Sequence, residues 1–71
     1  MEVLWLTEDE VKDLLSMDEA IVAVRKAFCD HGAGRTQMPP KSYLYFPRHE
    51  GDLRTMPAYL EGSEQAGVKI V

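Results

Sequence analysis

Two consecutive prolines, Pro39 and Pro40, divide the sequence into two parts with different hydrophobic patterns. Proline fixes φ and disfavours helix at the residue before it, so a proline pair imposes an extended segment. Before the pair, apolar residues recur every three or four positions, which is typical of helices. After it, short runs of aromatic and β-branched residues alternate with turn residues, which is typical of strands. The sequence therefore predicts an α+β fold, with N-terminal helices packed on an antiparallel β-sheet.

Two capping boxes mark the starts of two helices. Thr7 and Glu10 have the spacing of the first box, and Ser16 and Glu19 that of the second. We expect a short helix that ends near Ser16, followed by a longer helix that Gly32 and Gly34 stop. The longer helix carries one apolar stripe, made of Met17, Ala20, Ile21, Val24, Ala27 and Phe28.

Four segments have strand patterns: residues 3–6, 42–46, 53–60 and 66–71. Gly51 is expected to take the positive φ of the turn between the second and third of them. Pro57 lacks an N–H group, so we expect its strand to lie at a sheet edge or to contain a bulge. No breaker or cap follows Ile70 and Val71, so we expect more chain to follow the last strand.

The size of the chain limits its core. A chain of 71 residues buries only about 60% of the surface that its unfolded form exposes. The single cysteine, Cys29, excludes an internal disulfide, and Cys29, His31 and His49 lack the spacing of metal ligands. We therefore expect no metal, and we expect stability to come from a partner or from a larger enzyme of which this is a piece.

The charge balance argues against a nucleic-acid partner. The net charge is −4, from 12 acidic and 8 basic residues, and no basic arm or aromatic–basic stripe occurs. No apolar run approaches the roughly 18 residues of a membrane span. The N-terminus also lacks the charged and long apolar regions of a signal peptide. The sequence therefore predicts a cytoplasmic protein with no membrane partner.

Three cations lie in or beside the strand segments: Lys41, Arg54 and Lys69. By the strand period of two, Arg54 shares a face with apolar residues, where burial is costly unless an anion pairs with it. If the strands pair, the three cations can converge on one face and bind a carboxylate, which suits the planar fork of arginine. A partly desolvated lysine there can act as acid and base. The alternative is that each side chain simply extends to water.

The remaining candidates are weaker. Cys29 is interpreted as a buried helix residue, and His31 as a helix-end residue whose cationic ring complements the helix dipole. His49 lies in a turn. Tyr43 and Tyr45 are interpreted as packing or interface residues.

Several motifs resemble the ornithine cyclodeaminase and mu-crystallin family, most closely its archaeal-type members. They are residues 37–41 (QMPPK), 51–59 (GDLRTMPAY) and 66–71 (AGVKIV), with similar openings at residues 6–7 and 16–20. The motifs follow one another in order over essentially the whole chain. The resemblance implies that residues 1–71 are the incomplete N-terminal part of a substrate-binding and dimerisation domain, in a homodimer whose Rossmann domain binds NAD(H) or NADP(H).

The resemblance also implies residue roles and an activity. Lys69 matches the lysine that donates and accepts protons, Arg54 the arginine that grips the substrate carboxylate, and Lys41 a further basic contact to it. The implied reaction is NAD-dependent conversion of ornithine to proline and ammonia. The alternatives are an alanine dehydrogenase that makes pyruvate and ammonia, a mu-crystallin-like protein that binds NADPH and a small ligand, and a structural assembly module.

The chain departs from the family pattern in lacking a dinucleotide-binding fingerprint. No G-x-G-x-x-G loop follows a strand, and Gly32 and Gly34 instead follow a helix and lead to prolines. The acid and arginine that complete the family's site later in the chain are absent too. The implied amino-acid or keto-acid chemistry therefore belongs to the parent protein, and we expect the 71 residues alone to be inactive.

Overall fold

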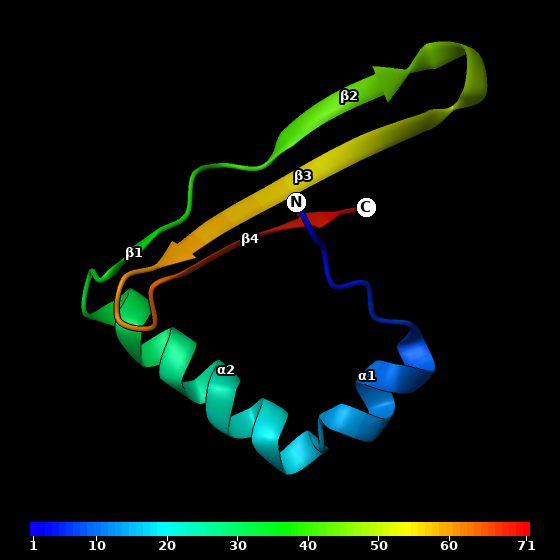
Figure 1. Cartoon of the computed structure of the whole chain (residues 1–71). Coiled ribbons are helices and arrows are strands. Elements are labelled where there is room, and N and C mark those ends of the chain that lie inside the picture. The colour runs from blue at the N-terminus through cyan, green and yellow to red at the C-terminus, as the bar shows by residue number, and fades with distance from the viewer.

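The computed structural model describes residues 1–71 and contains two α-helices and a four-stranded antiparallel sheet (Figure 1). The predicted α+β class is confirmed. In chain order the elements are α1 (Glu8–Leu14), α2 (Met17–Gly32), β1 (Thr36–Gln37), β2 (Ser42–Phe46), the 3-10 turn η1 (Pro47–His49), β3 (Gly51–Leu60) and β4 (Gln65–Ile70).

Both helices begin at the predicted capping boxes. The Thr7 hydroxyl accepts the Glu10 N–H at 3.3 Å, and the Ser16 hydroxyl accepts the Glu19 N–H at 3.1 Å. Each glutamate reaches back to the N-cap N–H, so two otherwise unpaired donors are satisfied at each start. The predicted end of α2 at the glycines Gly32 and Gly34 is also confirmed, because the helix ends at Gly32. Neither α1 nor α2 combines the length and the apolar composition that a membrane-spanning helix requires.

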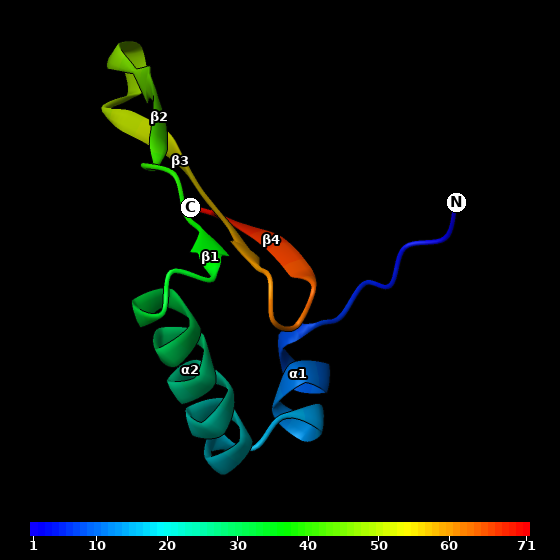
Figure 2. The same cartoon turned by 90° about the vertical axis from the view of Figure 1, so that its left-hand side faces the viewer.

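The predicted strand at residues 3–6 is wrong. This segment has no regular structure and leaves α1 as an extended arm (Figure 2). Val3, Leu4 and Trp5 are 78%, 82% and 83% exposed. A strand needs a neighbouring strand to satisfy its backbone N–H and C=O groups, and none lies beside this arm. The apolar pattern alone could not show that.

β3 is the central strand of the sheet. β4 pairs with one edge of it, and β1 and β2 pair one after the other with the opposite edge. Gln37 faces Tyr59 and Ser42 faces Thr55, so residues 38–41 lie opposite the shorter stretch 56–58. One extra residue is therefore accommodated between β1 and β2, as in a bulge.

Pro57 lies in this central strand, so its predicted edge position is wrong. Arg54 and Val71 exchange both backbone hydrogen bonds, at 2.8 and 3.0 Å. Because bonded and non-bonded positions alternate in an antiparallel pair, the nitrogen of Pro57 points away from β4. It faces the irregular segment that contains Pro39 and Pro40, where no ladder bond is needed. The predicted bulge is present, but it lies in residues 38–41, opposite Pro57.

The turn between β2 and β3 uses a different residue from the predicted one. Glu50 takes the left-handed conformation with φ 48°, directly after η1, while Gly51 already belongs to β3. The residue with positive φ in this turn is therefore Glu50, one position before the predicted Gly51.

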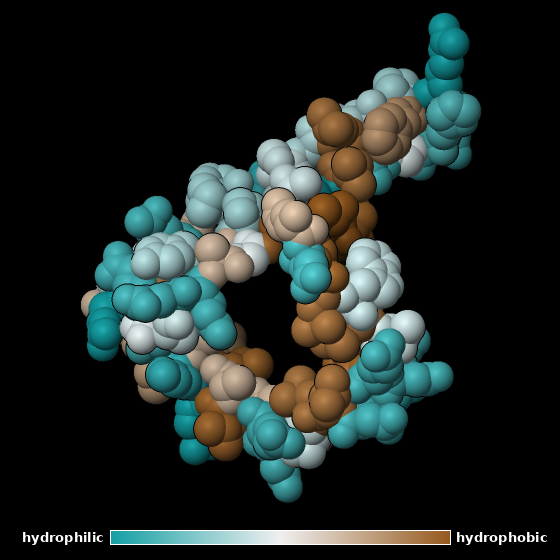
Figure 3. Space-filling view, in the orientation of Figure 1, coloured by the Kyte–Doolittle hydropathy of each residue, from teal (hydrophilic) through white to brown (hydrophobic).

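The chain has no closed core. None of the 71 residues is buried, and the accessible surface is 6729 Å². A compact chain of 8.0 kDa would expose about 4,450 Å². The radius of gyration is 15.3 Å, against about 11 Å for a compact chain of this length. Apolar side chains of the helices and the sheet surround an open hollow (Figure 3). Cys29 is exposed, so its predicted burial is wrong.

Candidate functional site

The site is built on the face of β3 that carries Arg54, Met56 and Ala58. Lys69 in β4 is the register partner of Met56. Directly opposed residues of an antiparallel pair project to the same face, so Lys69 shares the face of Arg54. The two are diagonal neighbours, a relation that places such residues about 7–8 Å apart, with their β-carbons somewhat closer and within reach of long side chains.

Lys41 reaches the same region from the other edge of β3. It lies just before β2, in the irregular segment, and lines a hollow of about 420 Å³ together with Met56. Met56 therefore has Lys69 opposite it on one side and shares a hollow with Lys41 on the other. The register thus brings Arg54 and Lys69 onto one face, and the irregular segment brings Lys41 beside that face without making it part of a strand.

Arg54 has an acidic partner that the sequence analysis did not find. Its Nε donates to Asp52 Oδ1 at 3.0 Å, and its Nη2 makes a longer hydrogen bond of 3.4 Å to Asp52 Oδ2. The ring of Tyr43 lies beneath the guanidinium, with 5.3 Å from Cζ to the ring centroid. The period of two along β3 was the available signal, because it puts Asp52 on the same face as Arg54.

These neighbours stabilise the charged form of Arg54. The hydrogen bond that Arg54 donates to Asp52, then the negative charge of Asp52, then the Tyr43 hydroxyl raise the pKa of the guanidinium above its ordinary value. The side chain of Arg54 is still 43% exposed, so an anionic ligand can approach it. The site can therefore hold a carboxylate through a permanent cation, with a lysine diagonal to it.

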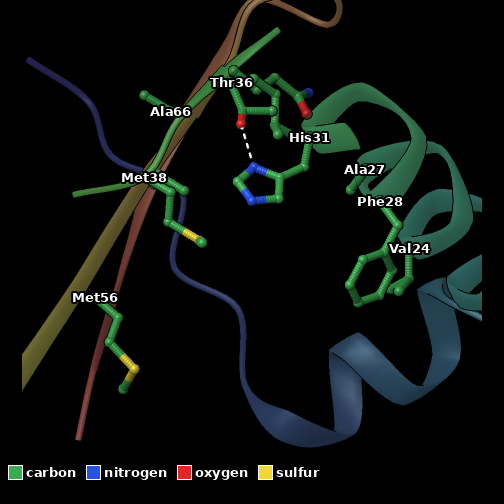
Figure 4. Close-up of a pocket in the computed structure, with 12 residues that line it drawn as sticks. Val24, Ala27, Phe28, His31, Thr36, Met38, Met56 and Ala66 are labelled. Carbon is green, nitrogen blue, oxygen red and sulfur yellow. Dashed lines mark hydrogen bonds between the residues drawn. The ribbon is translucent and has the colours of Figure 1, made fainter. Parts of the chain in front are cut away.

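The same sheet face lines a larger hollow of about 580 Å³ between the sheet and α2 (Figure 4). Its lining is mainly apolar and includes Val24 and Phe28 from α2 and Met56, Ala58 and Leu60 from β3. His31 also lines it, and its Nδ1 forms a 2.6 Å hydrogen bond with the Thr36 hydroxyl, which ties the end of α2 to β1. No aspartate or glutamate lines this hollow.

These residues do not fit a dinucleotide. A pyrophosphate cradle is formed by a glycine-rich loop between a parallel strand and a helix, whereas all the strand pairs here are antiparallel. A β-carbon added at Gly32 or Gly34 would meet nothing within 4 Å, so neither glycine serves a close approach of backbone. No three His, Cys, Asp or Glu side chains gather as metal ligands.

Comparison with known proteins agrees with the sequence motifs. Residues 1–71 match the ornithine cyclodeaminase/mu-crystallin family. The chain is 55% identical over its whole length to an alanine dehydrogenase of Archaeoglobus fulgidus. Over 97% of its length it is 33% identical to a delta(1)-pyrroline-2-carboxylate reductase of Bacillus cereus. The chain spans 21% of the length of each of these relatives. No solved structure matches.

Proposed function

This chain belongs to the ornithine cyclodeaminase/mu-crystallin family, and from that premise we propose that it supplies the carboxylate-binding and proton-transferring residues of an NAD(P)-dependent amino-acid dehydrogenase. Residues 1–71 would form part of its substrate-binding and dimerisation domain, in a cytoplasmic homodimer. The nicotinamide would be held by residues other than these.

One observation carries the proposal: the pairing of Met56 with Lys69, which makes Arg54 and Lys69 diagonal neighbours on one face. When the Arg54 guanidinium holds the α-carboxylate of the substrate there, the α-carbon and its amino group can lie beside β4, the strand that carries Lys69. Lys69 Nζ can then take a proton from the amino group or from the water that replaces it. Lys41 adds positive charge beside the carboxylate.

Alanine is the substrate that we propose, in place of the ornithine that the sequence analysis put first. The identity of 55% to an alanine dehydrogenase supports this choice. The apolar lining of the hollow beside the site supports it too, because a methyl group can enter such a space. The side-chain ammonium of ornithine would find no carboxylate in that lining and would be costly to desolvate.

Substrate and activity can be tested on the protein at its full natural length. Alanine and ornithine would each be titrated calorimetrically and assayed for turnover with NAD⁺ and with NADP⁺. We expect alanine to yield pyruvate and ammonia, and ornithine to yield no proline. Formation of proline would restore the cyclodeaminase assignment. Tight binding of nicotinamide and a small ligand without turnover would favour a mu-crystallin-like binding protein.

Two substitutions test the residue roles. Lys69→Met should lower kcat by at least about a hundredfold, the usual contribution of a proton-transferring side chain, with KM for alanine little changed. Lys26→Met, on exposed α2, is the matched control. Arg54→Ala should raise KM for alanine, because the carboxylate loses its partner. If Arg54→Ala leaves both KM and alanine binding unchanged, Arg54 does not bind the carboxylate and the proposal is wrong.

A further inference from the structure

Four side chains form a block on the β2–β3 hairpin, on the face that carries the site. Tyr43 lies directly opposite Arg54 in the register, and Tyr45 lies directly opposite Asp52. The two tyrosine rings stack, with centroids 5.7 Å apart and planes within 6° of parallel. Arg54 therefore contacts Asp52 along β3 and Tyr43 across to β2.

The way Asp52 contacts Arg54 leaves part of the guanidinium free. The hydrogen bonds to Asp52 come from Nε and Nη2, which form one edge of the planar group. The other edge, formed by Nη1 and the second N–H of Nη2, has no partner in the protein. A carboxylate binds an arginine in bidentate fashion through one such edge. Both edges of the Arg54 guanidinium can therefore be occupied at once, one by Asp52 and the other by a ligand carboxylate.

We propose that Asp52 and Tyr43 are positioning residues, which hold Arg54 so that its Nη1–Nη2 edge receives the substrate carboxylate. This inference rests on the proposed role of Arg54 in carboxylate binding. An unrestrained arginine loses considerable rotamer freedom when it binds a ligand. Asp52 lies two positions away on the same strand, and it restricts Arg54 together with the ring of Tyr43 before the substrate arrives. Substrate binding then costs less conformational entropy.

The opposite role for Asp52 makes the opposite prediction. If Asp52 merely competes with the substrate for the guanidinium, removing its charge should strengthen alanine binding. If Asp52 positions the guanidinium, removing its charge should weaken binding. The sign of the change therefore separates the two roles.

The test is a comparison of Asp52→Asn with wild type in steady-state kinetics on the protein at its full natural length. Loss of an orienting partner from a ligand-binding group costs about tenfold in affinity at the low end, judged from metal sites. We expect KM for alanine to rise by about that factor with kcat little changed. Asp52→Glu keeps the charge and should recover part of the loss. Asp13→Asn, on exposed α1, should change nothing.

A second pair of variants tests the aromatic partner. Tyr43→Phe keeps the ring under the guanidinium and should keep the wild-type KM, because the cation–π contact needs only the ring face. Tyr43→Leu removes the ring and should raise KM in the same direction as Asp52→Asn. Equal effects of the two Tyr43 variants would show that the ring does not position Arg54.

Arg54→Ala, measured in parallel, separates failure of the inference from failure of the proposed function. If it leaves KM unchanged, Arg54 is not the carboxylate ligand, and the proposed function and the positioning role both fall. If it raises KM while Asp52→Asn lowers KM or leaves it unchanged, carboxylate binding stands and the positioning role of Asp52 is overturned. A loss of kcat and thermal stability in Asp52→Asn that Asp52→Glu does not recover would overturn it as well.

Discussion

A substitution of Phe28 tests whether other protein surface covers the apolar hollow in the protein at its full natural length. Its side chain projects from α2 toward the hollow (Figure 4), and the residue is 72% exposed. Full burial of a phenylalanine side chain contributes roughly 1.5–3 kcal/mol. Only about a quarter of this residue is hidden from water here, so Phe28→Ala would cost less than about 1 kcal/mol if the face stayed open.

We expect a larger cost. The chain exposes 6729 Å², which exceeds the roughly 4,450 Å² of a compact chain of its mass by about half. Large apolar side chains throughout the chain are exposed, and Phe28 beside the hollow is one of them; exposure of apolar surface to water is unfavourable. If other protein surface covers this face, Phe28→Ala removes a core side chain and should cost about 3 kcal/mol or more.

The measurement is urea denaturation of the protein at its full natural length, followed by circular dichroism. Val22→Ala is the matched control, because Val22 is 69% exposed and does not line the hollow. We expect a cost below about 0.5 kcal/mol for the control, as for other surface substitutions. Equal effects of the two substitutions, or a cost of Phe28→Ala below about 1 kcal/mol, would refute the argument that the face is covered.

The remaining predictions concern the start of α2. Ser16→Ala should destabilise the helix by about 1 kcal/mol, because the hydroxyl that accepts the Glu19 N–H is lost. Ser16→Thr keeps a capping hydroxyl and should retain most of this stabilisation. Equal helix content and equal denaturation midpoints for wild type and both variants would contradict a stabilising role of the cap. Hydrogen bonds from the Ser16 backbone N–H and then its side chain lower the pKa of Glu19 below its ordinary value of 4.5. The stability that Glu19 contributes is therefore fully present above pH 4.5 and is lost as the pH falls through the lowered pKa of the folded state. Glu19→Gln should flatten that part of an acid-unfolding curve, with Glu2→Gln as control, and an unchanged curve would show that the carboxylate has no linked role.

The three cations show how far the sequence could predict the site. The period of two placed Arg54 on an apolar strand face, and the family motifs assigned carboxylate binding to Arg54 and Lys41 and proton transfer to Lys69. Strand pairing then placed Lys69 on the same face as Arg54. The roles of all three residues stay predictions. The partnership of Asp52 with Arg54 was missed, because which of several nearby charges pair depends on side-chain placement.

The sequence by itself determined the features that depend on neighbouring residues only. Capping hydroxyls, the residues that reach back to them and the periodic apolar stripe act within one or two helical turns, so the starts of both helices and the end of α2 follow from them. Only the tertiary structure decided the features that depend on segments far apart in sequence. Strand register set Lys69 opposite Met56, placed Pro57 in the central strand, and left residues 3–6 without a partner, because a ladder of hydrogen bonds forms only where a second strand is present.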